Sequence, residues 1–287
     1  MPTVVLETIA ELQAALASAR LKGSTIALVP TMGALHDGHL ALVDQAKTLG
    51  DIVIVSIFIN PLQFGPNDDL DRYPRTLRTD RDQLAARGVG YIFAPSVSEM
   101  YPDGAVQTTV AAGRVGALYE GRSRVGHFDG VLTVVAKLLN IVRPDAVVFG
   151  QKDAQQAFLV RQMIGDLNFA VRVDVVPTVR DAAGLALSSR NRFLDAHETR
   201  AALGLSVALE AAESSADRGT DAALAAAQSV LMGQHLVELD YLKIVDPATF
   251  FPVDEGYRGR AVVLVAARIG TTRLIDNQTI YLGGNRS

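Results

Sequence analysis

Two histidines, His36 and His39, lie three residues apart between an apolar run and an amphipathic stretch. The run, residues 26–29, is short and wholly apolar, which is typical of a parallel strand covered on both faces. A helix that begins near Asp37 or Gly38 would point its free N–H groups and the positive end of its dipole at the turn. Because imidazoles three residues apart can face the same ligand, we expect an anion-binding site here.

The same turn matches parts of two other motifs. A histidine pair is half of a zinc site, but the chain has no cysteine and no HExxH, and His127 is the one obvious third ligand, so we expect no metal bound by side chains. Gly33 and Gly38 have the spacing of a phosphate-binding P-loop, but the lysine and hydroxyl residue of that motif do not follow. What remains is a strand, a turn with His-x-Gly-His, and a helix.

Four segments carry a resemblance to a known family: residues 30–39 (PTMGALHDGH), 58–64 (FINPLQF), 149–156 (FGQKDAQQ) and 187–191 (LSSRN). The first alone resembles the motif with which the HxGH adenylyl-transferring superfamily binds ATP. The four together resemble the pantothenate synthetases (pantoate–β-alanine ligases), and the resemblance covers nearly the whole chain. It implies an ATP-dependent ligase of pantothenate and coenzyme A biosynthesis. Such an enzyme condenses (R)-pantoate with β-alanine to give pantothenate, AMP and diphosphate through pantoyl adenylate.

The composition agrees with a globular enzyme. Apolar residues make up 49% of the 287 residues, and the net charge of −4 argues against a nucleic-acid-binding surface. No apolar run has the length of a membrane span, and the first residues lack the features of a signal peptide. The lack of cysteine suggests a reducing compartment, so we expect a cytoplasmic protein; the charge and the apolar runs predict no nucleic-acid or membrane partner. The resemblance to the family also implies that the chain forms a homodimer.

We expect an α/β fold. The near-continuous β-branched residues of segment 51–60 predict a central parallel strand. After residue 195, alanine-rich helices run to about residue 233 and strands follow, which predicts a separate α+β arrangement. We therefore expect a Rossmann-like nucleotide- and pantoate-binding domain at residues 1–177 and a smaller α+β lid domain at residues 178–287. The expected strands of the second domain are residues 240–245, 261–267 and 279–282.

Four residues are candidates for substrate binding. Open α/β sheets bind ligands at the carboxyl ends of their strands, so Asn60 and Gln63 should lie near the histidine turn, although Asn-Pro alone would only begin a loop. Gln63 offers two donors and an acceptor, which suit a hydroxyl and a carboxylate. Gln156 follows Lys152 by one helical turn and can share its face. His127 begins an apolar helix and is as readily a cap as a ligand group; the resemblance places it, with the other three, at the substrate.

Two further segments are candidates for phosphate binding. Lys152 follows a strand that ends in glycine, where a lysine can neutralise phosphate, although in isolation it reads as a solvated surface residue. Residues 188–190 supply two hydroxyls and a guanidinium that can clamp a polyphosphate, although Ser188 or Ser189 would equally cap a helix. Family members usually have Gly-Glu-Lys-Asp and an aromatic residue here, and Gln151 and Ala154 depart from that pattern.

The resemblance implies a set of ATP contacts and magnesium bound through the phosphates. The expected ATP-binding residues are Met32, Gly33, Ala34, Leu35, His36, Asp37, Gly38, His39, Gly150, Gln151, Lys152, Asp153, Val179, Leu187, Ser188, Ser189 and Arg190.

Among these, His36, His39 and Lys152 are the expected catalytic residues. The histidines would donate hydrogen bonds to charge on the α-phosphoryl group, helped by the backbone of residues 32–38. In the family the second histidine of the motif is described as a proton donor, but a charged phosphoryl transition state favours the electrostatic role. Closure of the second domain or of loop 65–75 would exclude water from the adenylate.

Two other function classes are compatible with parts of the pattern. A nucleotidyltransferase shares HxGH, but its acceptor site should favour arginine or lysine over paired glutamines. A nucleotide-sensing module would keep the phosphate clamp, would need no glutamines for pantoate, and would bind ATP without turnover.

Overall fold

The computed structural model describes residues 3–65, 70–104 and 106–284, and the chain divides into two compact units. The first unit comprises Met1–Gly150 with Gln155–Pro177, and the second comprises Gln151–Ala154 with Thr178–Ser287. The first unit ends at Pro177, the residue that we expected to end the first domain, but residues 151–154 group with the second unit. The domain limits themselves stay a prediction.

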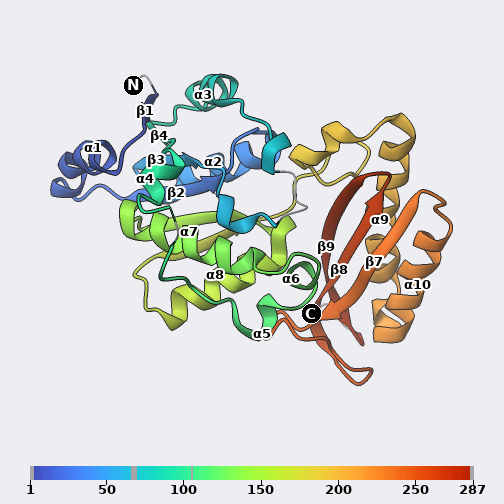
Figure 1. The fold of residues 1–287 in the computed structure, drawn as a ribbon. Helices are drawn as coiled ribbons and strands as arrows, with labels where there is room; N and C mark the ends of the chain where they lie inside the picture. Colours follow the sequence, from blue (N-terminus) through green and yellow to red (C-terminus); the bar gives the residue numbers. More distant parts are fainter. Residues whose placement is uncertain (1–2, 66–69, 105, 285–287) are drawn as a thin grey trace. The chain divides into compact units, whose positions relative to one another are not determined.

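The first unit is built on a six-stranded parallel sheet with strand order β1-β4-β3-β2-β5-β6 (Figure 1). Its strands are β1 (Val4–Leu6), β2 (Ile26–Thr31), β3 (Ile52–Ile57), β4 (Tyr91–Phe93), β5 (Ala146–Gly150) and β6 (Arg172–Val176). β3 lies between β4 and β2, which confirms the predicted central position. Residues 26–29 of β2 are at most 1% exposed, as expected for a parallel strand covered on both faces. The Rossmann-like α/β class is confirmed.

Helices connect the parallel strands, because such strands need long crossovers. They are α1 (Ile9–Leu21), α2 (Asp37–Leu49), α3 (Leu77–Ala86), α4 (Val97–Met100), α5 (Gly113–Gly116), α6 (Glu120–Ser123), α7 (His127–Val142) and α8 (Ala154–Asp166), with the 3₁₀ turns η1 (Pro61–Gln63) and η2 (Leu70–Arg72). α2 begins at Asp37, as predicted, with His36 as its N-cap. α7 is apolar on almost every side and is buried along most of its length, which suits a helix in the interior of a layered unit.

The second unit packs two helices on an antiparallel sheet of strand order β7-β8-β9 (Figure 1). Its elements are η3 (Gln151–Asp153), η4 (Ser189–Phe193), α9 (Ala196–Ser214), η5 (Ala216–Arg218), α10 (Thr220–Met232), β7 (Val237–Val245), β8 (Gly259–Ile269) and β9 (Thr272–Leu282). The predicted strand at residues 279–282 was too short, since β9 begins at Thr272. The polar pair Asp276 and Asn277, both 4% exposed, interrupts the apolar pattern that a buried strand normally shows.

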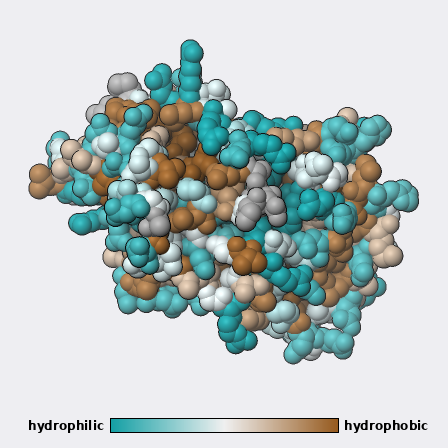
Figure 2. Space-filling view, viewed as in Figure 1, coloured by the Kyte–Doolittle hydropathy of each residue, from teal (hydrophilic) through white to brown (hydrophobic). Residues whose placement is uncertain are grey.

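On the face drawn in Figure 2, hydrophilic residues (teal) are interspersed with smaller groups of apolar ones (brown). Across the described ranges, no helix has both the length and the hydropathy of a membrane span.

Candidate active site

The histidine turn connects β2 to α2 and takes an unusual backbone path. Gly33 and Ala34 both have positive φ, +83° and +53°, so the chain reverses sharply before the helix. The Nδ1 atom of His36 accepts from the backbone N–H of Gly38 at 3.1 Å, and that of His39 accepts from the N–H of His36 at 3.4 Å. The two ring centroids are 4.1 Å apart.

These contacts decide which nitrogen of each ring carries the hydrogen. A nitrogen that accepts from a backbone N–H has its lone pair there, so a neutral imidazole carries its hydrogen on Nε2. Both His36 and His39 are therefore arranged to donate through Nε2. Two such donors on adjacent rings suit an anionic oxygen.

A buried carboxylate holds the turn in place. Asp80 of α3 is 1% exposed, and its two oxygens accept from the backbone N–H groups of Ala34 and Leu35 at 3.0 and 2.9 Å. Thr76 donates to the same carboxylate at 3.1 Å, and a Cβ on Gly33 would lie 3.0 Å from its Oδ2. The carboxylate thus binds the turn from the protein side.

This arrangement bears on one prediction and adds one residue. We expected the backbone of residues 32–38 to help bind ATP; the N–H groups of Ala34 and Leu35 donate to Asp80, and the part played by the rest of that backbone stays a prediction. The sequence analysis missed Asp80, because an aspartate within a charged helix resembles any solvated acidic residue. Its helix neighbour Asp82 is of that solvated kind and is exposed.

A polar cluster lies next to the turn. Asn60 donates to the side-chain oxygen of Gln63 at 3.2 Å, and Gln63 in turn donates to the sulfur of Met32 at 2.9 Å. Met32 belongs to the histidine turn, so the structure brings Gln63 to the turn as predicted from the strand-end rule. A Cβ on Gly130 of α7 would lie 2.2 Å from the carbonyl oxygen of Leu62, so only glycine allows α7 to approach η1 this closely.

His127 is the first residue of α7 and contacts the backbone of the same cluster. Its Nδ1 lies 2.8 Å from the carbonyl oxygen of Gln63, and its Nε2 lies 3.1 Å from Nη1 of Arg124. Arg124 also donates to the Gln63 carbonyl at 3.2 Å. The N-cap of α7 is Gly126, so His127 is not the cap; it and Arg124 support Gln63 instead.

The two glutamines that begin α8 have different environments. Gln155 is 5% exposed and donates to the carbonyl groups of Val115 and Leu118 at 2.8 and 2.9 Å. Its side-chain oxygen accepts from the N–H of Glu120 at 3.1 Å. Gln155 therefore anchors the segment around α5 and α6, whereas the neighbouring candidate Gln156 is only partly buried.

The predicted common face of Lys152 and Gln156 stays a prediction. η3 is a 3₁₀ turn, and regular α-helix begins only at Ala154. The spacing of one α-helical turn therefore does not apply between them. The two residues also belong to different compact units.

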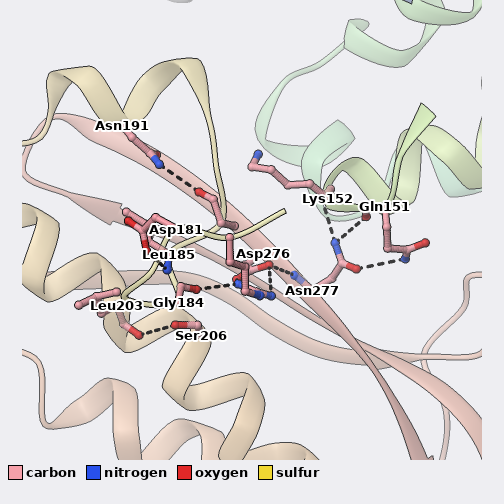
Figure 3. Close-up of polar contacts among 12 residues, drawn as sticks. Gln151, Lys152, Asp181, Gly184, Leu185, Asn191, Leu203, Ser206, Asp276 and Asn277 are labelled. Carbon is pink, nitrogen blue, oxygen red and sulfur yellow. Dashed lines mark hydrogen bonds and ion pairs between the residues drawn. The ribbon is translucent and has the colours of Figure 1, made fainter. Parts of the chain in front are cut away.

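The segment that carries Lys152 is held by a strand of the second unit. Asn277 of β9 donates to the carbonyl groups of Gln151 and Lys152, both at 2.9 Å, and accepts from the side chain of Gln151 at 3.2 Å. Figure 3 shows the Lys152 side chain extending away from Asn277. From the sequence alone Asn277 could be a site residue but did not stand out from a structural one, because a link between residues 125 positions apart leaves no local pattern.

The segment that precedes η4 is held by a second polar group. Arg180 pairs with Asp276 through two contacts of 2.6 and 3.0 Å and donates to the carbonyl of Gly184 at 3.2 Å. Ser188 caps η4 by accepting from the N–H of Arg190 at 3.3 Å, as the alternative reading of this segment expected. Its O–H hydrogen remains a donor for a ligand.

The predicted ATP-binding residues differ in exposure. Gly33, Ala34 and Leu35 are buried, while Asp37 and Asp153 are exposed. The partly buried members are Met32, His36, Gly38, His39, Gly150, Gln151, Lys152, Val179, Leu187, Ser188, Ser189 and Arg190. The predicted lid, loop 65–75, includes residues 66–69, which lie outside the described residues.

The chain was compared with known proteins. Residues 4–279 match the family model described as Pantoate-beta-alanine ligase. Pantothenate synthetase of Leifsonia xyli is 56% identical over 260 residues, covering 90% of each chain. That of Nocardia farcinica is 56% identical over 261 residues, covering 91% of this chain and 81% of the relative.

Solved structures agree. The crystal structure of pantothenate synthetase from Thermus thermophilus has a TM-score of 0.89 at 46% identity and covers 97% of this chain and 99% of its own. Pantoate-beta-alanine ligase from Francisella tularensis, complexed with Beta-gamma ATP and Beta-alanine, has a TM-score of 0.79 at 34% identity, with 96% and 97% covered. The match in sequence and fold extends over nearly the whole chain, which therefore belongs to the pantoate–β-alanine ligase family.

Proposed function

We propose how this chain condenses (R)-pantoate with β-alanine at the expense of ATP. A carboxylate is a poor acceptor for an amine, so pantoate must first be activated. A carboxylate oxygen attacks the α-phosphorus of ATP, a C–O–P linkage forms, and diphosphate leaves with the electrons of the broken P–O bond. The amine of β-alanine then attacks the carbonyl carbon of pantoyl adenylate. The amide bond forms, AMP leaves, and the amine loses a proton to solvent or base.

The pair of imidazoles in the histidine turn supports this path most directly. His36 and His39 both accept backbone N–H groups at Nδ1 and so donate through Nε2. In our proposal these donors meet the negative charge that builds on the α-phosphoryl oxygens. Gln63 and Gln156 would position pantoate beside them, since Gln63 contacts Met32 of the same turn.

The second unit would hold the outgoing diphosphate. Lys152 supplies a mobile positive charge, and Arg190 supplies a planar group suited to phosphate oxygens. The hydroxyls of Ser188 and Ser189 would add hydrogen bonds, and Asn277 would keep Lys152 in place through its backbone carbonyl.

We propose magnesium as the counter-ion of the phosphates. The described residues contain no group of three or more histidine, cysteine, aspartate or glutamate side chains that would hold a metal. Magnesium usually takes most of its ligands from phosphate oxygens and water, which fits such a site. The ion would neutralise charge on the departing diphosphate.

Three further properties belong to the same proposal. The loop at residues 65–75 or the second unit would close over the adenylate and exclude water. The chain would act as a homodimer, as the resemblance implies, and would work in the cytoplasm, in keeping with the lack of cysteine.

An assay of the half-reaction tests the proposal. The protein is incubated with ATP, magnesium and pantoate, with and without β-alanine, and diphosphate and AMP are followed in a quenched-flow instrument. We expect one diphosphate per active site without the amine, and AMP with pantothenate only when the amine is added. A stable adenylylated product that never needs the amine would indicate a nucleotidyltransferase. ATP binding without any diphosphate would indicate a sensing module.

A further inference from the structure

Asn60 has all four of its hydrogen-bonding positions occupied by the protein. Its Oδ1 accepts from the hydroxyl of Tyr101 at 2.8 Å and from the N–H of Leu62 at 3.3 Å. Its Nδ2 donates to the carbonyl of Gly130 at 3.1 Å and to Oε1 of Gln63 at 3.2 Å. A primary amide has two donor hydrogens and two main acceptor positions, and this one is 1% exposed. Asn60 therefore has no hydrogen-bonding position left for a substrate.

The orientation of this amide has only one solution. The backbone N–H of Leu62 can only donate, and the carbonyl of Gly130 can only accept. Oδ1 of Asn60 must therefore face Leu62, and Nδ2 must face Gly130. A reversed amide would oppose a donor to a donor and an acceptor to an acceptor in a buried site, where unmade hydrogen bonds are costly.

The orientation of the Asn60 amide also determines the orientation of the Gln63 amide. Because Asn60 presents a donor, the atom of Gln63 that faces it must be the acceptor Oε1. The NH₂ group of Gln63 then points to the other side, where it contacts the sulfur of Met32 at 2.9 Å. A thioether is a weak acceptor that takes one hydrogen, so the second hydrogen of the NH₂ group remains for a ligand as far as residues 3–65, 70–104 and 106–284 are concerned.

Tyr101 is the third member of this chain of hydrogen bonds. Its hydroxyl donates to Asn60, and burial raises the pKa of Tyr101 to about 12. The hydroxyl thus keeps its proton at neutral pH and remains a donor. Tyr101 itself is 4% exposed and reaches the cluster from the residue after α4.

We propose that Tyr101 and Asn60 are positioning residues that act on pantoate only through Gln63. Together with the two backbone anchors they hold the amide of Gln63 so that it meets the carboxylate of pantoate with N–H donors. The amide of Gln63 then presents hydrogens to the oxygen atoms of a carboxylate, whereas an ammonium group has no acceptor for them. This inference rests on the proposed binding of pantoate by Gln63, and it changes the role expected for Asn60 from contact to orientation.

A double-mutant cycle separates the two roles. Asn60→Ala should raise the KM for pantoate roughly tenfold and leave the KM for ATP unchanged, because it frees Gln63 to rotate. In a Gln63→Ala background the same Asn60→Ala change should have no further effect on the pantoate KM. If Asn60 touched pantoate itself, the two losses would multiply.

Tyr101→Phe gives a milder second test that keeps the ring. It should raise the pantoate KM several-fold, leave kcat nearly unchanged, lower the melting temperature through the lost hydrogen bond to Asn60, and lose its effect on KM in the Gln63→Ala background. The matched control is Tyr91→Phe, which removes a hydroxyl from a partly buried tyrosine on β4. Should Asn60→Ala fail to fold, the Tyr101→Phe cycle decides the question.

The outcomes separate the positioning role of Asn60 and Tyr101 from the proposed binding of pantoate by Gln63. If Gln63→Ala leaves the pantoate KM unchanged, the proposed pantoate site is wrong. If Gln63→Ala raises it and either Asn60→Ala or Tyr101→Phe multiplies that loss, the site stands and the positioning role is overturned.

Discussion

Each of the two segments that carry the proposed reactive groups is held by one buried side chain. In the first unit that side chain accepts hydrogen bonds from the backbone, and in the second unit it donates them. In the first unit, a single side chain, Asp80, binds two successive backbone N–H groups, those of Ala34 and Leu35. In the second unit, a single side chain, Asn277, binds two successive carbonyl groups, those of residues 151 and 152. Each holding residue lies on a separate element, and each is at most 4% exposed.

The difference in charge has a physical reason. The histidine turn precedes a helix and has N–H groups to satisfy, for which a carboxylate is the stronger acceptor. The segment at 151–152 offers carbonyls and carries Lys152, whose charge is needed for phosphate. A carboxylate at position 277 would attract that ammonium group and repel the carbonyls, whereas an amide satisfies them without charge. Four predictions test this comparison, in order of decreasing effect.

The largest effect is expected at the turn itself. His39→Ala should reduce the single-turnover rate of diphosphate release by roughly 100- to 1,000-fold, the size seen when a transition-state hydrogen-bond donor is removed. The melting temperature should change little, because His39 is only partly buried. The control is His197→Ala on α9, and a normal rate of AMP formation in His39→Ala would refute the assigned role.

Asp80→Asn tests the holding carboxylate. An asparagine presents one NH₂ group to a backbone N–H, so the turn loses a charged hydrogen bond that typically contributes about 1.5–3 kcal/mol. We expect adenylate formation to fall by roughly tenfold or more and the melting temperature to fall by several degrees. Asp82→Asn on the exposed side of α3 should change neither, and a stable Asp80→Asn with full activity would show that the turn keeps its shape unaided.

Asn277→Ala tests the amide that holds residues 151 and 152, as Asp80→Asn tests the carboxylate that holds the histidine turn. Loss of two donors to the 151–152 backbone should raise the KM for ATP by roughly several-fold, and the KM for pantoate should stay constant. The matched control is Asn140→Ala, an exposed asparagine that bonds only within α7. If both KM values rose together, the effect of Asn277 would be on folding and not on phosphate binding.

The smallest effect is a dependence of stability on pH in the first unit. Burial raises the pKa of both Tyr101 and Tyr119 from 10.0 to about 12. A group whose pKa is higher in the folded state contributes stability that is fully present below pH 10 and is lost as pH rises towards 12. We expect the melting temperature to fall across this window and to fall less steeply in Tyr101→Phe than in Tyr91→Phe. Equal slopes would show that ionisation of Tyr101 is not coupled to folding.

Local patterns predicted much of the fold because they depend on near neighbours. The start of α2 at Asp37 and the central strand β3 both follow from residues that are close together in the sequence. The shared face of Lys152 and Gln156 stays a prediction, because Lys152 lies in a 3₁₀ turn and the spacing assumed a continuous α-helix.

Periodicity and short motifs depend on neighbouring residues, so the α/β class, the histidine turn and the resemblance to the family could be predicted from the amino-acid sequence. The buried side chains that hold the reactive segments could be recognised only in the packed molecule. Asp80, Tyr101 and Asn277 reach partners 41 to 126 residues away along the chain. A hydrogen bond over such a separation depends on how the elements pack, and it leaves no periodic signal around either residue.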